Sequence, residues 1–100
     1  MERHIELGGR EIRLRYTVNA MCAVEERAGG ALERITDRQF TATRLLLWGG
    51  MLELQPDTTP EQAGDIISRH IESGGSMDEI VDICAQAMQD AGFFHHAAAK

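Results

Sequence analysis

The chain has 100 residues, 43% of them hydrophobic and 26% charged, which suits one globular domain and leaves no room for a second core. Sixteen acidic residues against ten basic ones give a formal net charge of −6, and the segment from Asp57 to Asp90 contains Arg69 as its one Lys or Arg. Such an acidic chain repels phosphate, so we expect no nucleic-acid partner.

Two further features bear on localisation. The longest apolar stretch, Leu45 to Leu54, is about half of the roughly 20 residues that a membrane-spanning helix needs. No basic segment followed by an apolar one opens the chain, as it would in a secretory signal. We therefore expect a soluble cytoplasmic protein that does not bind membranes.

Residues with alternating polar and apolar character flank Gly8-Gly9, in His4–Leu7 and in Arg10–Tyr16. This pattern around a Gly-Gly pair predicts an antiparallel β-hairpin. Its apolar face would carry Ile5, Leu7, Ile12, Leu14 and Tyr16. An isolated hairpin is only marginally stable in water, so this face is expected to pack against helices. The free strand edges also make a homo-oligomer possible.

Helical patterns occupy the rest of the chain. Thr17 or Asn19 would cap the first helix, Gly29-Gly30 would end it, and Ala31 to Ile35 would add one turn. Thr41 would start the second, whose main part, Arg44 to Leu52, is apolar on nearly all sides and therefore expected to be buried. Capping boxes at Thr59–Gln62 and Ser76–Glu79 would open the third and fourth helices. The expected inner faces are Ala20, Met21, Val24 and Ala28, then Ala63, Ile66, Ile67, His70 and Ile71, then Met77, Ile80, Val81, Cys84 and Met88.

These elements predict an α+β fold in which an N-terminal antiparallel β-hairpin packs on a small bundle of about four helices. Residues 1–92 would form a single domain, and residues 93–100 a flexible C-terminal tail.

The two cysteines are the first candidates for chemistry. Cys22 and Cys84 lie within apolar helical patterns, so both are expected to be buried structural thiols. His70 precedes Cys84 by one helix and could contact it, but both fall on expected inner faces. We therefore predict no catalytic residue and no enzyme activity.

Metal and cofactor sites have equally little support. The close pairs typical of metal sites, Cys-x-x-Cys and His-x-x-x-His, do not occur, and the adjacent His95-His96 would point in different directions. Glu25 is expected to form a structural ion pair with Arg44 or Arg15. The paired glycines lack the context of a phosphate-binding loop. We predict no metal and no cofactor.

Several apolar residues of the sequence are candidates for binding a partner protein. Trp48 lies beside Gly49-Gly50, where another backbone could approach closely, although core packing would explain the same pattern. Phe93 and Phe94 follow the last helix and would either fold back on the core or anchor a partner. The candidate partner-binding residues are Trp48, Met51, Leu52, Phe93 and Phe94.

In order and spacing, several segments resemble phage tail assembly chaperones, in the branch also found in gene transfer agents. The resemblance rests on Ile5, Leu7–Gly9, Leu14–Thr17, Asn19–Glu26, Gly29–Leu32, Leu46–Met51, Pro56, Thr58–Thr59, Glu61, Gly64 and Ile66–Ile67. It implies a protein of the bacterial host cytoplasm that binds the tape measure protein, keeps it soluble and helps recruit tail tube subunits. It implies no catalytic residues.

Two other classes remain open. The first is a structural minor tail or tail tube component that stays in the particle, although one hairpin is little β-structure for a tube subunit. The second is a small helix-turn-helix regulator, which the net charge and the lack of an Arg- or Lys-rich helix oppose.

Overall fold

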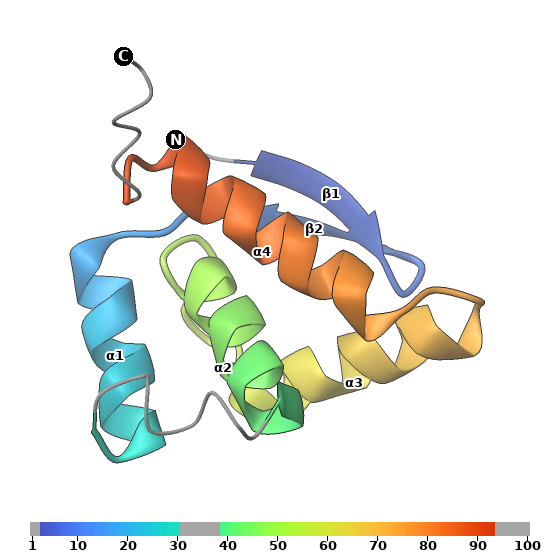
Figure 1. Ribbon diagram of the computed structural model, residues 1–100, viewed down its shortest axis with the longest axis horizontal. Helices are drawn as coiled ribbons and strands as arrows, with labels where there is room; N and C mark the ends of the chain where they lie inside the picture. Colours follow the sequence, from blue (N-terminus) through green and yellow to red (C-terminus); the bar gives the residue numbers. More distant parts are fainter. Residues whose placement is uncertain (1–2, 31–38, 94–100) are drawn as a thin grey trace.

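The computed structural model describes residues 3–30 and 39–93. In chain order the elements are β1 (Arg3–Leu7), β2 (Arg10–Leu14), α1 (Val18–Ala28), α2 (Gln39–Leu52), α3 (Pro60–Glu72) and α4 (Met77–Asp90). The predicted α+β fold is confirmed, with an N-terminal antiparallel hairpin packed against four helices (Figure 1). The expected turn at Ala31–Ile35, the pair His95-His96 and the tail beyond Phe93 lie outside the described residues.

The hairpin forms around two consecutive glycines with positive φ, 58° at Gly8 and 81° at Gly9. Residues other than glycine seldom adopt positive φ angles. A tight two-residue hairpin turn requires a positive φ at both of its central residues. Ile5 pairs with Ile12 in the register. The inward face is buried as expected at Leu7, Ile12, Leu14 and Tyr16, and half-buried at Ile5.

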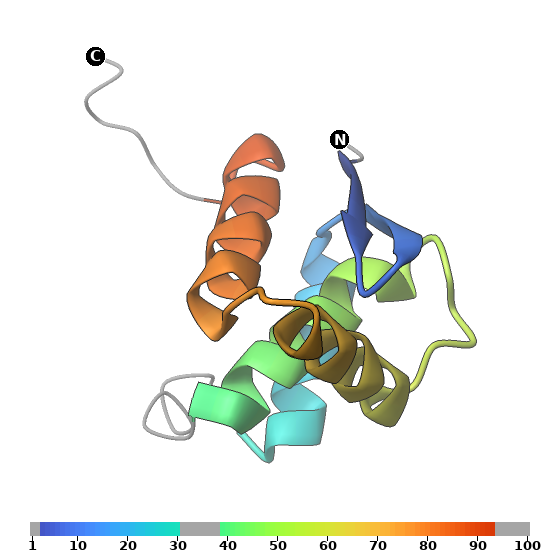
Figure 2. The ribbon, with the colours of Figure 1, turned by 90° about the vertical axis from the view of Figure 1, so that its right-hand side faces the viewer.

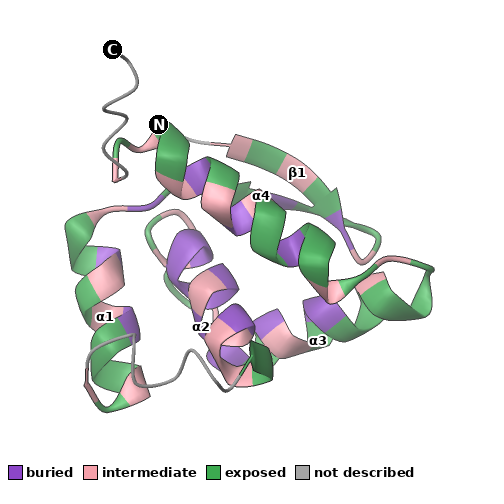
Figure 3. Ribbon diagram, viewed as in Figure 1, coloured by how far each residue is buried: buried purple, intermediate pink, exposed green. Residues whose placement is uncertain are grey.

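Helix α2 is the centre of the molecule, because it contacts α1, α3, α4 and β2. The prediction that this apolar helix is buried is confirmed, and Figure 3 shows buried residues along much of its length. The helix begins at Gln39, two residues before the expected Thr41. Seen from the side, α4 lies to the left of the hairpin (Figure 2).

Two adjacent glycines of α2 let neighbouring elements approach its backbone. A Cβ at Gly49 would lie 2.5 Å from Cγ2 of Val24 on α1, and a Cβ at Gly50 would lie 2.7 Å from Cζ of Tyr16. The amide of Arg15 donates to the carbonyl oxygen of Gly50 at 2.8 Å. These glycines therefore set the spacing of α1 and β2 against α2.

The helix boundaries follow local capping chemistry. Thr17, rather than Asn19, caps α1 by accepting a hydrogen bond from the amide of Ala20, and Gly29 ends the helix in the left-handed conformation. Both predicted capping boxes are present, at Thr59 for α3 and at Ser76 for α4. Each cap satisfies amides that would otherwise lack partners at a helix start.

Three expectations about buried residues were wrong. Cys22 is exposed, because α1 packs mainly on α2 and buries only the narrow face of Ala20 and Val24. Ile71 is 41% exposed in the last turn of α3, and Val81 is 37% exposed. Val81 follows the fully buried Ile80, and one residue turns a helix by about 100°, which carries the side chain off the covered face.

Within residues 3–30 and 39–93, no helix has the length and hydropathy needed to cross a bilayer.

Candidate functional site

Four of the five expected partner-binding residues are described by the structure, and these four do not form one exposed surface. Trp48 and Met51 are buried, and Leu52 is half-buried against the same core. Phe93 is half-buried and packs edge-on against Tyr16, with ring centroids 6.5 Å apart. Phe94 lies outside the described residues. Core packing accounts for these side chains here, and their contact with a partner stays a prediction.

Trp48 has a clear structural role. Its indole Nε1 donates to the carbonyl oxygen of Thr58 at 2.7 Å, which ties α2 to the loop before α3. The guanidinium of Arg27 lies 5.3 Å from the centre of the indole ring, a distance typical of a cation–π contact.

His70, which could have contacted Cys84, has a different hydrogen-bond partner. His70 Nε2 lies 2.8 Å from a carboxylate oxygen of Glu79, and this carboxylate also accepts from the amide of Ser76. Those two hydrogen bonds, the Ser76 bond first, lower the pKa of Glu79. His70 therefore belongs to the α3–α4 junction and not to a nucleophile–base pair.

Cys84 instead lies beside Tyr16 in the core. Burial raises the pKa of the Cys84 thiol to about 11, and burial, followed by the proximity of Cys84, raises the pKa of Tyr16 well above its ordinary value of 10.0. The Tyr16 hydroxyl donates to the carbonyl oxygen of Leu46. A thiol with so high a pKa is a poor nucleophile, so Cys84 packs as a small apolar side chain, as expected.

Glu25 is exposed, and among the described residues it forms no ion pair with Arg44 or Arg15, so that expectation was wrong. Helix α1 presents Glu25 to solvent instead. The described residues also contain no group of three or more His, Cys, Asp or Glu side chains able to hold a metal ion.

Arg44 has a different environment from the one expected. It lines an apolar depression of about 240 Å³, here named the α2–α3 hollow, together with Phe40, Gly64, Ile67, Ser68, Ile71 and Met77. Phe40 is 74% exposed, and the buried Nε of Arg44 has no hydrogen-bond partner among the residues that the structure describes. The described part of the hollow thus combines exposed apolar surface with the cation of Arg44 and contains no carboxylate.

Gly64 makes this arrangement possible. A Cβ at position 64 would lie 3.0 Å from Cδ of Arg44, so the missing side chain gives the arginine stem room to cross α3. The sequence alone does not indicate this hollow. The available signals were Phe40 before an apolar helix and a glycine in the middle of the α3 pattern, and neither indicates which helix lies opposite.

A second apolar hollow, of about 390 Å³, lies along α1, and we name it the α1 hollow. It is lined by Val18, Met21, Cys22, Glu25 and Phe93. Val18 is 70% exposed at its edge, nearly the same fraction as Phe40. This hollow carries a carboxylate where the α2–α3 hollow carries a guanidinium.

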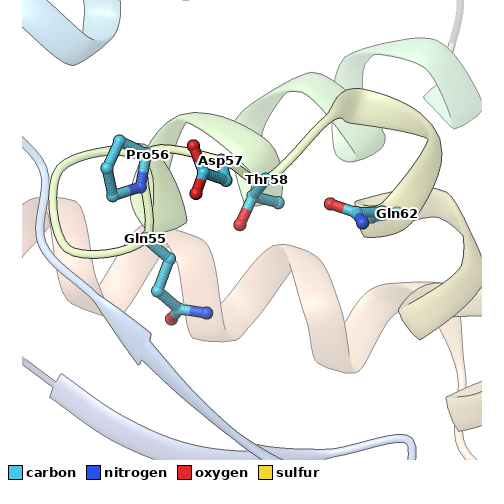
Figure 4. A pocket seen from close by; sticks show the side chains of 5 residues that line it. All are labelled: Gln55, Pro56, Asp57, Thr58 and Gln62. Atoms are coloured by element: carbon cyan, nitrogen blue, oxygen red, sulfur yellow. The ribbon is translucent and has the colours of Figure 1, made fainter.

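The third depression is polar. It lies at the α2–α3 loop, has a volume of about 250 Å³ and is lined by Gln55, Pro56, Asp57, Thr58 and Gln62 (Figure 4). Gln62 already accepts from the amide of Thr59, and Gln55 accepts from the amide of Arg13. Its described lining contains one carboxylate and no cation, which makes this depression unsuited to a phosphate-bearing ligand.

A scan against known protein families, a search of curated proteins and a search of solved structures find no match to this chain.

Proposed function

We propose that this protein is a tail assembly chaperone of a phage or gene transfer agent. It binds the tape measure protein in the host cytoplasm, keeps it soluble and helps recruit tail tube subunits. The proposal starts from the sequence resemblance over about residues 4–72.

One structural observation supports a binding role in particular. The α2–α3 hollow places the 74%-exposed ring of Phe40 beside further apolar side chains on a chain of net charge −6. Exposed apolar surface can cover apolar segments of a partner, while excess negative charge keeps the complex from aggregating. A chaperone must also leave when the tube polymerises, so micromolar affinity per copy, roughly −8 kcal/mol, is adequate.

Co-expression with the tape measure protein encoded nearby tests the proposal. We expect the tape measure protein to become soluble and to co-elute with many copies of this chain in size-exclusion chromatography with light scattering. A tape measure protein that stays insoluble, while this chain elutes alone, contradicts the proposal.

Particle composition separates the chaperone from the structural alternative. We expect quantitative mass spectrometry of finished tails to detect little or none of this chain. Stoichiometric amounts in finished tails would instead identify a minor tail or tail tube component.

A further inference from the structure

We propose that the α2–α3 hollow binds one turn of an amphipathic helix of the tape measure protein, with a carboxylate of that helix on the guanidinium of Arg44. This inference rests on the proposed function and adds the site and the chemistry of the partner segment. Its basis is the charge and the burial of the side chains that line the hollow.

The guanidinium of Arg44 is a charged group that lines the hollow. Within residues 3–30 and 39–93, its buried Nε has no hydrogen-bond partner, and no acidic side chain lines the hollow around it. A buried donor of a charged group is costly to leave unpaired, so an incoming acceptor is favoured there. A carboxylate is the acceptor that the planar guanidinium binds best, since it can receive two parallel hydrogen bonds.

The size and lining of the hollow indicate a helix rather than a small molecule. Its volume of about 240 Å³ is below that of typical ligand pockets, which start at about 300 Å³, but suits one or two side chains. Phe40 and Ile71, which line the hollow and are 74% and 41% exposed, offer apolar contact. Backbone carbonyls within a helix are already hydrogen-bonded, so the acceptor must come from a side chain. A helix with an aliphatic residue and an Asp or Glu three or four positions away meets both requirements.

The charge of the chain gives this contact its specificity. Eight acidic residues lie between Asp57 and Asp90, with Arg69 as the one Lys or Arg, so most of this region repels an acidic helix. Arg44 reaches the hollow from α2 over the gap left by Gly64. An acidic partner residue is therefore accepted at Arg44 and disfavoured elsewhere on this part of the molecule, which would set the register of the bound helix.

The test uses fluorescently labelled 25-residue peptides that tile the tape measure protein, titrated with the full-length chain and followed by fluorescence anisotropy. For the peptide that binds best, we expect Arg44→Met to weaken binding about tenfold, the loss typical of one charge-assisted hydrogen bond. Replacing the acidic residue of the peptide by its amide should weaken binding to the wild type equally. The same replacement should have no effect on binding to Arg44→Met, because the two changes remove one interaction.

Two matched controls accompany these measurements. Arg69→Met changes the net charge equally but lies on exposed α3 surface outside the hollow, and it should leave binding unchanged. Phe40→Ser should weaken binding, whereas Val18→Ser, at an equally exposed site in the α1 hollow, should not. Circular dichroism checks that each variant is folded.

Several results would overturn the inference. Equal binding by the wild type and Arg44→Met, with the tape measure protein still kept soluble, refutes the inference and leaves the proposed function standing. Loss of binding in Val18→Ser but not in Phe40→Ser moves the site to the α1 hollow. If light scattering shows that the wild type is a dimer and that Arg44→Met is a monomer, the occupant of the hollow is a second copy of this chain. No binding by the wild type refutes the proposed function together with the inference.

Discussion

Replacing Gly50 with alanine separates helix propensity from packing, because the two effects have opposite signs at this position. Gly50 lies within α2, where alanine is favoured over glycine by about 1 kcal/mol. A Cβ there would lie 2.7 Å from Cζ and 2.8 Å from the hydroxyl oxygen of Tyr16, and 2.9 Å from Cδ2 of Leu14. These atoms cannot move away easily, because the Tyr16 hydroxyl bonds to the carbonyl of Leu46 and the ring packs against Phe93.

The contacts give a rough magnitude for Gly50→Ala. Overpacking against the Tyr16 ring costs about 3 kcal/mol, the upper end of its usual range, and the ring shift that partly relieves the clash breaks the Tyr16 hydroxyl bond, which costs about 1 kcal/mol more. Subtracting the propensity gain of about 1 kcal/mol leaves a net destabilisation of about 3 kcal/mol. For a domain of this size, that corresponds to a fall in Tm of about 12–24 °C.

Urea denaturation followed by circular dichroism and by the fluorescence of Trp48, the single tryptophan, measures this change. Gly64→Ala is the matched control, since Gly64 also lies within a helix but its Cβ would meet only the flexible stem of Arg44. For Gly64→Ala we expect a free energy of unfolding that is unchanged or up to about 1 kcal/mol higher than that of the wild type. If Gly50→Ala is as stable as the wild type, close packing of the hairpin on α2 is not what keeps glycine at this position.

Arg44→Met should raise the free energy of unfolding by about 1 kcal/mol, because it removes a buried donor that has no partner among the described residues; a lower free energy of unfolding in urea denaturation would mean that Arg44 is paired. The pKa of Glu79 is lowered from its ordinary value of 4.5, so the unfolded chain binds more protons at this group than the folded chain does. Its contribution to stability is present above that value and is lost as the pH falls through the lower folded-state pKa. Glu79→Gln should therefore flatten the fall in urea midpoint as the pH drops below 4.5, and an unchanged slope would contradict this. A maleimide reagent at about pH 7 should label native protein at the exposed Cys22, and Cys84, buried with a pKa of about 11, should react only on unfolding; intact mass measurements of wild type and Cys22→Ser decide this.

Local features of the sequence determined the elements of this fold. Alternation around Gly8-Gly9 specified the hairpin, and the capping boxes at Thr59 and Ser76 specified where α3 and α4 begin. The apolar circumference of α2 identified the buried central helix. These signals are readable because turn conformation, helix capping and burial on all sides depend on residues that are neighbours in the chain.

The tertiary structure alone decided which side of each outer helix is covered. Cys22, Ile71 and Val81 fit apolar stripes as well as their buried neighbours do, yet α1 packs mainly on α2 and the side chains at 71 and 81 face solvent. The α2–α3 hollow likewise exists only because folding brings Arg44 over Gly64, on helices whose order in the sequence does not show how they cross. Periodicity marks a face that can be buried, but only the position of the neighbouring elements determines how much of that face is covered and which part stays open to a partner.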